Sequence, residues 1–156
     1  MTAKVLGISG SPVKNSNTDR MVKHILESTG LDSEFVKLSD MDVRPCRACK
    51  KCVDDNICKV NDDFPDLADK VTSAGAIVVG SYCPYSSVDA FTKAFLERLW
   101  SLRHVNNHVR GKLAATVVTG VVPQVTGQVS QMLAMEMNMD RMNVVGQIEV
   151  MGNVPC

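Results

Sequence analysis

With 156 residues, the chain has the length of a single domain and can bury a sizeable core. Its 17 basic and 17 acidic side chains cancel, which argues against general binding to nucleic acid or to a membrane surface. No apolar run approaches the ~20 residues of a membrane span and the amino terminus lacks a signal-peptide pattern, so we expect a cytoplasmic protein.

Apolar patterning predicts strands and helices that alternate along the chain. In chain order, the predicted elements are a strand over 3–9, a helix over 18–29, a strand over 34–38, a helix over 64–73, a strand over 76–80, a helix over 91–102, a strand over 113–118, a helix over 127–140 and a strand over 144–150. This alternation predicts one α/β domain with a parallel sheet and helices on both faces. Because ligands bind beyond the carboxyl ends of such strands, residues 9–18, 81–88 and 119–128 should face one site.

The segment between the first strand and the first helix is rich in small polar residues. It reads Ser-Gly-Ser-Pro-Val-Lys-Asn-Ser-Asn-Thr over residues 9–18. A helix N-terminus offers N–H groups and a partial positive charge, so a loop of this kind suits an anion. We interpret it as a cradle for a phosphate monoester; an ordinary strand-to-helix turn, capped by Asn17 or Thr18, is the alternative.

The two other segments suit a flat ring better than a second phosphate. Residues 81–87 place two tyrosines and a proline at a strand end, where they can wall one face of a ring. A surface turn is the alternative there. Residues 119–128 supply backbone and amide hydrogen bonds for ring edges. Together the three segments describe a mononucleotide with a tricyclic ring, which is FMN.

Four cysteines with the spacing C-x2-C-x2-C-x5-C give the sharpest signal in the chain. They lie in residues 44–63, which have no apolar period, and are Cys46, Cys49, Cys52 and Cys58. In a reducing compartment such cysteines are ligands or redox groups rather than disulfides. Two-residue gaps let successive thiolates surround one centre, so we predict a [4Fe–4S] cluster. Zinc and non-ligating cysteines are the alternatives.

Basic side chains are interleaved with these cysteines. They are Arg44, Arg47, Lys50 and Lys51. Their charge would raise the reduction potential of a cluster and favour an acidic partner. A solvated charged loop is the simpler interpretation, and the two are compatible.

The helix predicted over residues 127–140 carries two apolar stripes. Val129, Met132 and Leu133 form the first stripe. Met135 and Met139, continuing to Met142, form the second. One stripe can pack on the sheet, which leaves the other in need of cover. We predict a subunit interface there, with an unusually apolar core helix as the alternative.

Taken together, these residues resemble a known family. The run Gly-Ser-Pro-x-Lys-Asn-Ser-Asn-Thr at 10–18 resembles the phosphate loop of flavodoxin-like, NADPH-dependent FMN reductases. Gly80-Ser81, followed by Tyr85, Ser87-Val88 and the run Lys-Ala-Phe-Leu-Glu-Arg at 93–98, is similar as well. With Pro45 and the four cysteines in between, the pattern is most similar to the iron–sulfur flavoprotein branch, over residues 4–155.

The resemblance implies a flavodoxin-like three-layer sandwich with a five-stranded sheet in the order 2-1-3-4-5. It also implies FMN, a [4Fe–4S] cluster on the four cysteines, and a homodimer or tetramer in which the cluster of one subunit approaches the flavin of another. The phosphate would be held by Ser9, Ser11, Lys14, Ser16, Asn17 and Thr18. The ring would be surrounded by Tyr82, Cys83, Pro84, Tyr85, Ser86, Thr119, Gly120 and Val121.

The chain departs from this family in a few places. Val13 stands where many relatives have arginine, and Lys14 is a candidate substitute for that charge. Tyr82 takes a place usually held by proline, and Pro84 one usually held by an aromatic residue. Residues 121–123 replace a glycine-rich turn. The chain stops at Pro155-Cys156, short for the family, and a further C-terminal tail is an expectation.

Three functions are compatible with these features. In the first, electrons pass between an external donor such as ferredoxin, the cluster and FMN to a small acceptor. In the second, the protein is an NAD(P)H-dependent FMN or quinone reductase whose cysteine loop is structural or binds zinc. In the third, it is a non-enzymatic electron carrier or redox sensor.

Overall fold

The computed structural model describes residues 5–152 of the chain. The strands are β1 (Val5–Ser9), β2 (Ser33–Lys37), β3 (Ala76–Tyr82), β4 (Leu113–Gly120) and β5 (Asn143–Met151). The helices are α1 (Asn17–Ser28), α2 (Phe64–Ser73), α3 (Ala90–Leu99) and α4 (Pro123–Met139), with short 3-10 turns η1 (Leu38–Asp40) and η2 (Trp100–Leu102). The start of the first predicted strand, at residues 3–4, and Cys156 lie outside the described residues.

All five strands are parallel and pair in the order β2-β1-β3-β4-β5. The predicted strand order is therefore confirmed. The register aligns Ser9 with Lys37 on one side and Gly80 on the other, and aligns Tyr82 with Thr119. The carboxyl ends of β1, β3 and β4 thus meet at one edge of the sheet, as the sequence predicted for the segments that follow them.

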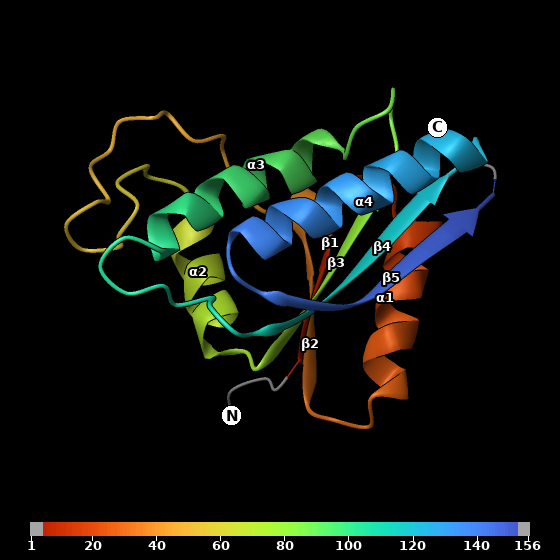
Figure 1. Ribbon diagram of the computed structural model, residues 1–156, viewed down its shortest axis with the longest axis horizontal. Coiled ribbons are helices and arrows are strands. Elements are labelled where there is room, and N and C mark those ends of the chain that lie inside the picture. The colour runs from red at the N-terminus through yellow and green to blue at the C-terminus, as the bar shows by residue number, and fades with distance from the viewer. Residues whose placement is uncertain (1–4, 153–156) are drawn as a thin grey trace.

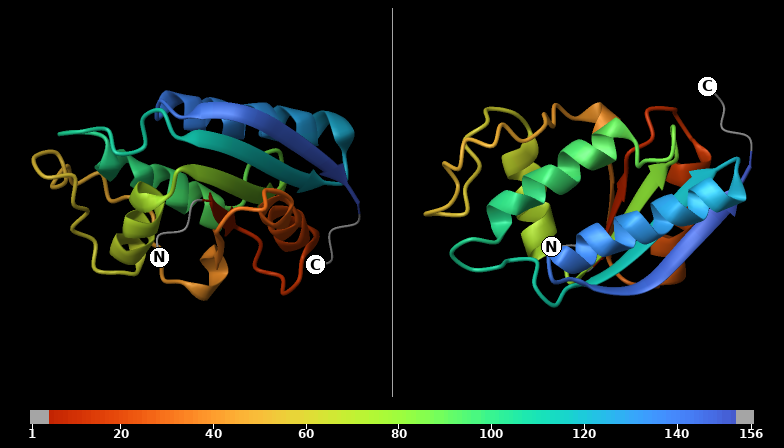
Figure 2. Two further views of the ribbon diagram at one scale, coloured as in Figure 1. Left: turned by 90° about the horizontal axis from the view of Figure 1, so that it is seen from below. Right: turned by 45° about the horizontal axis from the view of Figure 1, so that its top comes forward.

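Helices cover both faces of the sheet, which gives the predicted three layers (Figures 1 and 2). On one face, α2, α3 and α4 bury the larger core, with Phe64, Phe95 and Leu133 almost completely inaccessible. On the other face α1 packs Val22 and Leu26 against the strands. Within residues 5–152, no helix is both long and apolar enough to cross a membrane.

Helix α4 begins four residues earlier than the sequence predicted. Pro123 occupies its first turn, where the fixed φ of proline suits a helix start and its missing N–H costs nothing. Thr126 is already helical: its N–H and its hydroxyl both donate to the carbonyl of Val122, each at 2.9 Å. Residues 123–126, predicted to precede the helix, therefore belong to it. Gly127, predicted as the first residue of the helix, lies in its second turn.

The two stripes of α4 have different environments. Val129, Leu133 and Met137 are buried against the sheet. Met135 and Met139 are 57% and 64% exposed. Met142, assigned to the outer stripe, follows the helix and is buried. The outer stripe is therefore a short exposed methionine pair.

Candidate functional site

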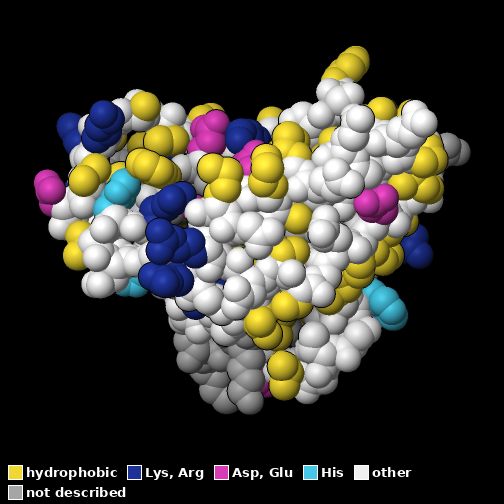
Figure 3. Space-filling view, viewed as in Figure 1, with side chains coloured by type: hydrophobic (Ala, Val, Ile, Leu, Met, Phe, Trp, Pro, Cys, Tyr) yellow, Lys and Arg dark blue, Asp and Glu magenta, His cyan; other side chains and the backbone are white. Residues whose placement is uncertain are grey.

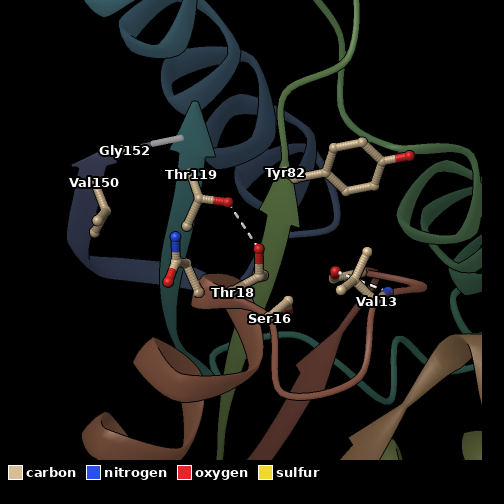
Figure 4. Close-up of a pocket in the computed structure, with 9 residues that line it drawn as sticks. Val13, Ser16, Thr18, Tyr82, Thr119, Val150 and Gly152 are labelled. Atoms are coloured by element: carbon tan, nitrogen blue, oxygen red, sulfur yellow. Dashed lines mark hydrogen bonds between the residues drawn. The ribbon is translucent and has the colours of Figure 1, made fainter. Parts of the chain in front are cut away.

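A pocket lies at the carboxyl edge of the sheet, where the three predicted segments meet (Figure 4). Figure 4 shows Tyr82 and Val13 on one side of it and Thr119 and Val150 on the other. Its lining residues are Ser11, Val13, Ser16, Asn17, Thr18, Tyr82, Thr119, Val150 and Gly152. Six of these nine were predicted as cofactor-binding residues.

The pocket opens onto the first turn of α1. Ser16, the N-cap residue, accepts a hydrogen bond from the Asp19 N–H at 3.0 Å on its hydroxyl. The helix therefore starts at Asn17, and neither Asn17 nor Thr18 is the cap. The first N–H groups of a helix have no partner within it and point out along its axis, so this end of α1 presents hydrogen-bond donors and partial positive charge to the pocket.

The loop before α1 is compact and internally hydrogen-bonded. The Val13 N–H donates to the Ser11 hydroxyl at 3.3 Å, and the Ser16 N–H donates to the Val13 carbonyl at 3.3 Å. Asn15 adopts a positive φ of 53°, a conformation that asparagine tolerates better than most residues. These contacts bring the hydroxyls of Ser11 and Ser16 to the same pocket.

A second contact fixes α1 to the middle of the sheet. The hydroxyls of Thr18 and Thr119 form a hydrogen bond at 2.7 Å, although they are 101 residues apart in the chain. Both residues are buried and both line the pocket. The first and third segments are thus joined at the floor of the site.

Ser9, predicted to hold a phosphate, lies behind the loop rather than in the pocket. It is completely buried, and its hydroxyl donates to Asp19 Oδ1 at 2.6 Å. Side chains alternate along a strand, and Ser9 falls on the face of β1 that packs on α1. Lys14, the other predicted phosphate ligand outside the lining, is exposed.

The remaining predicted ring residues surround a neighbouring depression. Cys83, Tyr85, Ser86 and Val121 line it, together with Val122, Val125 and Thr126. The Tyr85 side chain is fully exposed, and Tyr85 and Ser86 have positive φ values of 47° and 63°. Burial raises the pKa of the Cys83 thiol, which keeps it in the neutral form. Pro84 and Gly120 lie beside these residues in the chain.

Val13, Val150 and Gly152 line the pocket without having been predicted. Val150 lies in β5 and Gly152 directly follows it, and the carboxyl end of this strand reaches the same edge of the sheet. Gly152 donates its N–H to the Gly120 carbonyl at 3.0 Å. The rule that ligands bind beyond the carboxyl ends of parallel strands applies equally to the fifth strand and is the signal that identifies this segment.

The cysteine loop, residues 41–63, is closed at its base by a buried ion pair. Arg98 of α3 donates to both carboxylate oxygens of Asp62, at 2.5 and 3.0 Å, and both side chains are fully buried. Arg98 also donates to the Arg44 carbonyl at 2.9 Å, and Asp62 accepts the Arg44 N–H at 3.0 Å. The segment that enters the loop and the segment that leaves it are thus joined directly, through the Arg44 N–H and Asp62, and also through Arg98.

Asn56 holds the middle of the same loop. Its side-chain oxygen accepts the N–H groups of His104 and Val105 at 2.8 and 3.0 Å, and its Nδ2 donates to the Asn106 carbonyl at 2.6 Å. Asn56 is buried and has a positive φ of 59°. The loop therefore packs against the segment that follows α3.

The four predicted metal ligands share this loop but differ in exposure. Each is a free thiol: Cys52 is buried, Cys46 and Cys58 are half-buried, and Cys49 is exposed. Burial, with added repulsion from the other three thiols, raises the pKa of Cys52, and the Ala48 N–H donates to the Cys46 sulfur at 3.4 Å. Within residues 5–152 no three Cys, His, Asp or Glu side chains come close enough to form a metal-binding group. The donor chemistry fits an iron–sulfur cluster, and the loop holds its thiols apart.

The fold and the edge pocket define the chain as a flavodoxin-like α/β protein. A solved flavodoxin from the domain Archaea matches it with a TM-score of 0.61 at 18% identity, covering 96% of this chain and 85% of that one. The model of the NADPH-dependent FMN reductase family matches residues 3–154. The chain belongs to that family.

Two curated relatives are iron-sulfur flavoproteins, from Methanocaldococcus jannaschii and Methanosarcina thermophila. Each is 32% identical to this chain over 120 residues, which is 75% of this chain. The aligned region spans 62% and 63% of the two relatives, so the chain covers just under two thirds of their length. The predicted family and its iron–sulfur flavoprotein branch are confirmed.

Proposed function

We propose that the protein is a flavin-dependent oxidoreductase that binds FMN in the edge pocket. The observation that carries this proposal is the meeting of the α1 N-terminus with the ends of β3 and β4 around one pocket. Ser11, Ser16 and the first turn of α1 would hold the phosphate, and Tyr82 would flank the ring. When bound, a flavin accepts one or two electrons and so links one-electron donors to two-electron acceptors.

We further propose a [4Fe–4S] cluster on Cys46, Cys49, Cys52 and Cys58. Four thiols on one loop supply the ligand set that such a cluster needs. The N–H of Ala48 directed at the Cys46 sulfur is the kind of hydrogen bond that stabilises a thiolate ligand. A cytoplasmic location belongs to the same proposal, because exposed thiols stay reduced there.

The two proposed sites lie at opposite ends of α3 (Figures 1 and 2). The ten residues of α3 alone span ~15 Å, and the cysteine loop packs beyond its C-terminal end. This separation supports electron transfer between subunits of a homodimer or tetramer. A groove beside the cysteine loop supplies an apolar surface for that contact, and Figure 3 shows hydrophobic side chains on this face. The groove includes Val53, Leu96, Trp100, Met135 and Met139.

The proposed function and a second candidate function differ in the electron donor that they require. Exposed basic residues on the cysteine loop, including Arg47, Lys50 and Lys51, favour an acidic one-electron donor such as ferredoxin. The open arrangement of the thiols favours instead an NAD(P)H-dependent FMN or quinone reductase without a functional cluster. NADPH that rapidly bleaches the bound flavin would support the second candidate. Reduced protein that turns over no acceptor would point to a carrier or redox sensor.

Analysis of metal and flavin in anaerobically purified protein tests both cofactors. We expect a brown protein with iron near the ~4 atoms per chain that a cubane requires, together with FMN. Cys52→Ser should lose the iron and retain most of the FMN. Asn17→Ala combined with Thr18→Ala should weaken FMN binding and leave the iron in place. Equal loss of both cofactors in either variant, or zinc in place of iron, would contradict the assignment of two separate sites.

Sedimentation velocity tests the proposed oligomer. We expect the wild-type protein to sediment as a dimer or tetramer, because the exposed Met135 and Met139 side chains would be buried by a second copy. Met135→Lys should shift the distribution toward monomer. Gln131→Lys, an exposed position on the same helix but outside the groove, is the control and should not. A monomeric wild type would remove the intersubunit electron path.

A further inference from the structure

A largely buried lysine bonds the loop that lines the pocket. Lys37, the last residue of β2, places its Nζ 2.9 Å from the Val13 carbonyl oxygen and 2.6 Å from Asp19 Oδ2. The exposed fractions of the Lys37 and Asp19 side chains are only 12% and 4%. The other carboxylate oxygen of Asp19 accepts the Ser9 hydroxyl. One buried network therefore joins β1, β2, α1 and the loop.

This network sets the orientation of the loop backbone. The Val13 carbonyl accepts from both Lys37 Nζ and the Ser16 N–H, so this acceptor is turned into the protein. The side chain of Val13 and the hydroxyl-bearing residue Ser16 remain at the pocket. A carbonyl oxygen that faced the pocket would repel an anion, and Lys37 holds this one on the far side of the loop.

The same network offsets a negative charge. Asp19 lies in the first turn of α1, next in the chain to Asn17 and Thr18, which line the pocket that is proposed to take a phosphate. An unpaired carboxylate at that depth would both incur a desolvation cost and oppose an incoming anion. The Lys37 ammonium neutralises it at 2.6 Å, so the partial positive charge of the helix end reaches the pocket undiminished.

We infer that Lys37 is a positioning residue that makes the pocket select the phosphorylated flavin, FMN, over riboflavin. This inference rests on the proposed flavin site and adds the basis of its phosphate specificity. Lys37 does not line the pocket. It acts through the Val13 carbonyl and the Asp19 carboxylate.

The test compares the dissociation constants of FMN and riboflavin, measured by fluorescence quenching with the purified apoprotein. Lys37→Met should weaken FMN binding about tenfold and change riboflavin binding by less than about twofold, because only the phosphate meets the uncompensated Asp19 charge. Lys70→Met is the matched control: Lys70 pairs with Glu34 of β2 at the surface, away from the pocket, and should change neither constant. Lys37→Arg keeps the charge and should retain most of the preference.

Asp19→Asn gives an independent result that does not depend on the folding of the methionine variant. It removes the negative charge and leaves Lys37 in place, so the preference for FMN over riboflavin should increase. Equal weakening of both flavins by Lys37→Met, or an unchanged preference in Asp19→Asn, would overturn the inference. A wild-type protein that binds neither flavin would instead overturn the proposed function.

Discussion

Replacing Arg98 with methionine is expected to lower the free energy of unfolding by about 3–5 kcal/mol, because it leaves a buried carboxylate without its partner. Asp62 is fully buried and receives two hydrogen bonds from the guanidinium. The same guanidinium lies over the Phe64 ring, 4.3 Å from its centroid. Methionine fills part of the volume but supplies neither the charge nor the hydrogen-bond donors.

The pKa of Asp62 explains why the loss of stability in Arg98→Met should be large at neutral pH. Burial acts to raise the pKa of Asp62, but hydrogen bonds from Arg98 and from the N–H groups of Arg44 and Phe64 outweigh it and lower the pKa. A carboxyl whose pKa is depressed by folding stabilises the protein above its unfolded-state pKa and loses that contribution only as pH falls through the lower folded value. Measurements at pH 7 therefore sample the full ion pair.

Urea unfolding followed by circular dichroism measures this effect, and Arg103→Met is the matched control. Arg103 also pairs with an aspartate, Asp140, and also lies over an aromatic ring, that of Trp100. Its side chain is 28% exposed and donates a single hydrogen bond, and burial raises the pKa of Asp140, so that carboxyl can take up a proton when Arg103 is lost; the loss should cost about 1–2 kcal/mol. Similar decreases in the free energy of unfolding for the two variants would show that the Arg98–Asp62 pair contributes no more than the Arg103–Asp140 pair.

The same variant should loosen the cysteine loop. Arg98 bonds both the Arg44 carbonyl and Asp62, so its removal leaves the two ends of the loop with only their direct hydrogen bonds, such as that from the Arg44 N–H to Asp62. Trypsin should then cleave Arg98→Met faster than the wild type at Arg47, Lys50 and Lys51. Asp62→Asn, which keeps the shape of the side chain, should give the same change to a smaller extent.

Local sequence patterns were sufficient for the fold and for much of the pocket. Alternating apolar runs placed all five strands, and the small polar residues after β1 placed Ser11, Ser16 and Thr18 at the site. The predicted start of α4 at residue 127 is four residues late, because Pro123 already begins the helix. The helix start at residues 123–127 depends on the packing of α4 against β4 and β5, which the local sequence does not show.

The contacts that hold the two sites in place were beyond sequence reasoning. Arg98 appeared only as the last letter of a family motif, although it binds residues 36 and 54 positions away. Lys37 appeared only as one residue within the strand predicted over 34–38. Such long-range polar pairs leave no period in the sequence, since each partner is a single residue whose role depends on the register of the sheet. The burial of Ser9 against α1, by contrast, could have been predicted, because side chains alternate between the two faces of a strand.

Gly10→Ala is expected to destabilise the protein by about 3 kcal/mol and to abolish FMN binding, because a methyl group has no room there. A Cβ at Gly10 would lie 2.0 Å from the Thr92 hydroxyl and 2.4 and 2.5 Å from the two Asp89 oxygens. These atoms belong to a tight network: Asp89, the N-cap of α3, accepts the Thr92 N–H at 2.8 Å and the Ser81 hydroxyl at 2.6 Å. Either the network or the loop must shift.

The matched control is Gly146→Ala in β5. The nearest atom to its added Cβ is the Ala115 Cβ at 3.9 Å, an ordinary contact, so the change should stay within about 0.5 kcal/mol. Both variants are compared by urea unfolding and by FMN titration. If Gly10→Ala were as stable as Gly146→Ala, the loop would have freedom to move away from α3. That freedom would undermine the pocket as a preformed phosphate site, since Gly10 also carries the hydrogen bond at 2.9 Å from its N–H to the Gly80 carbonyl that joins the start of the loop to β3.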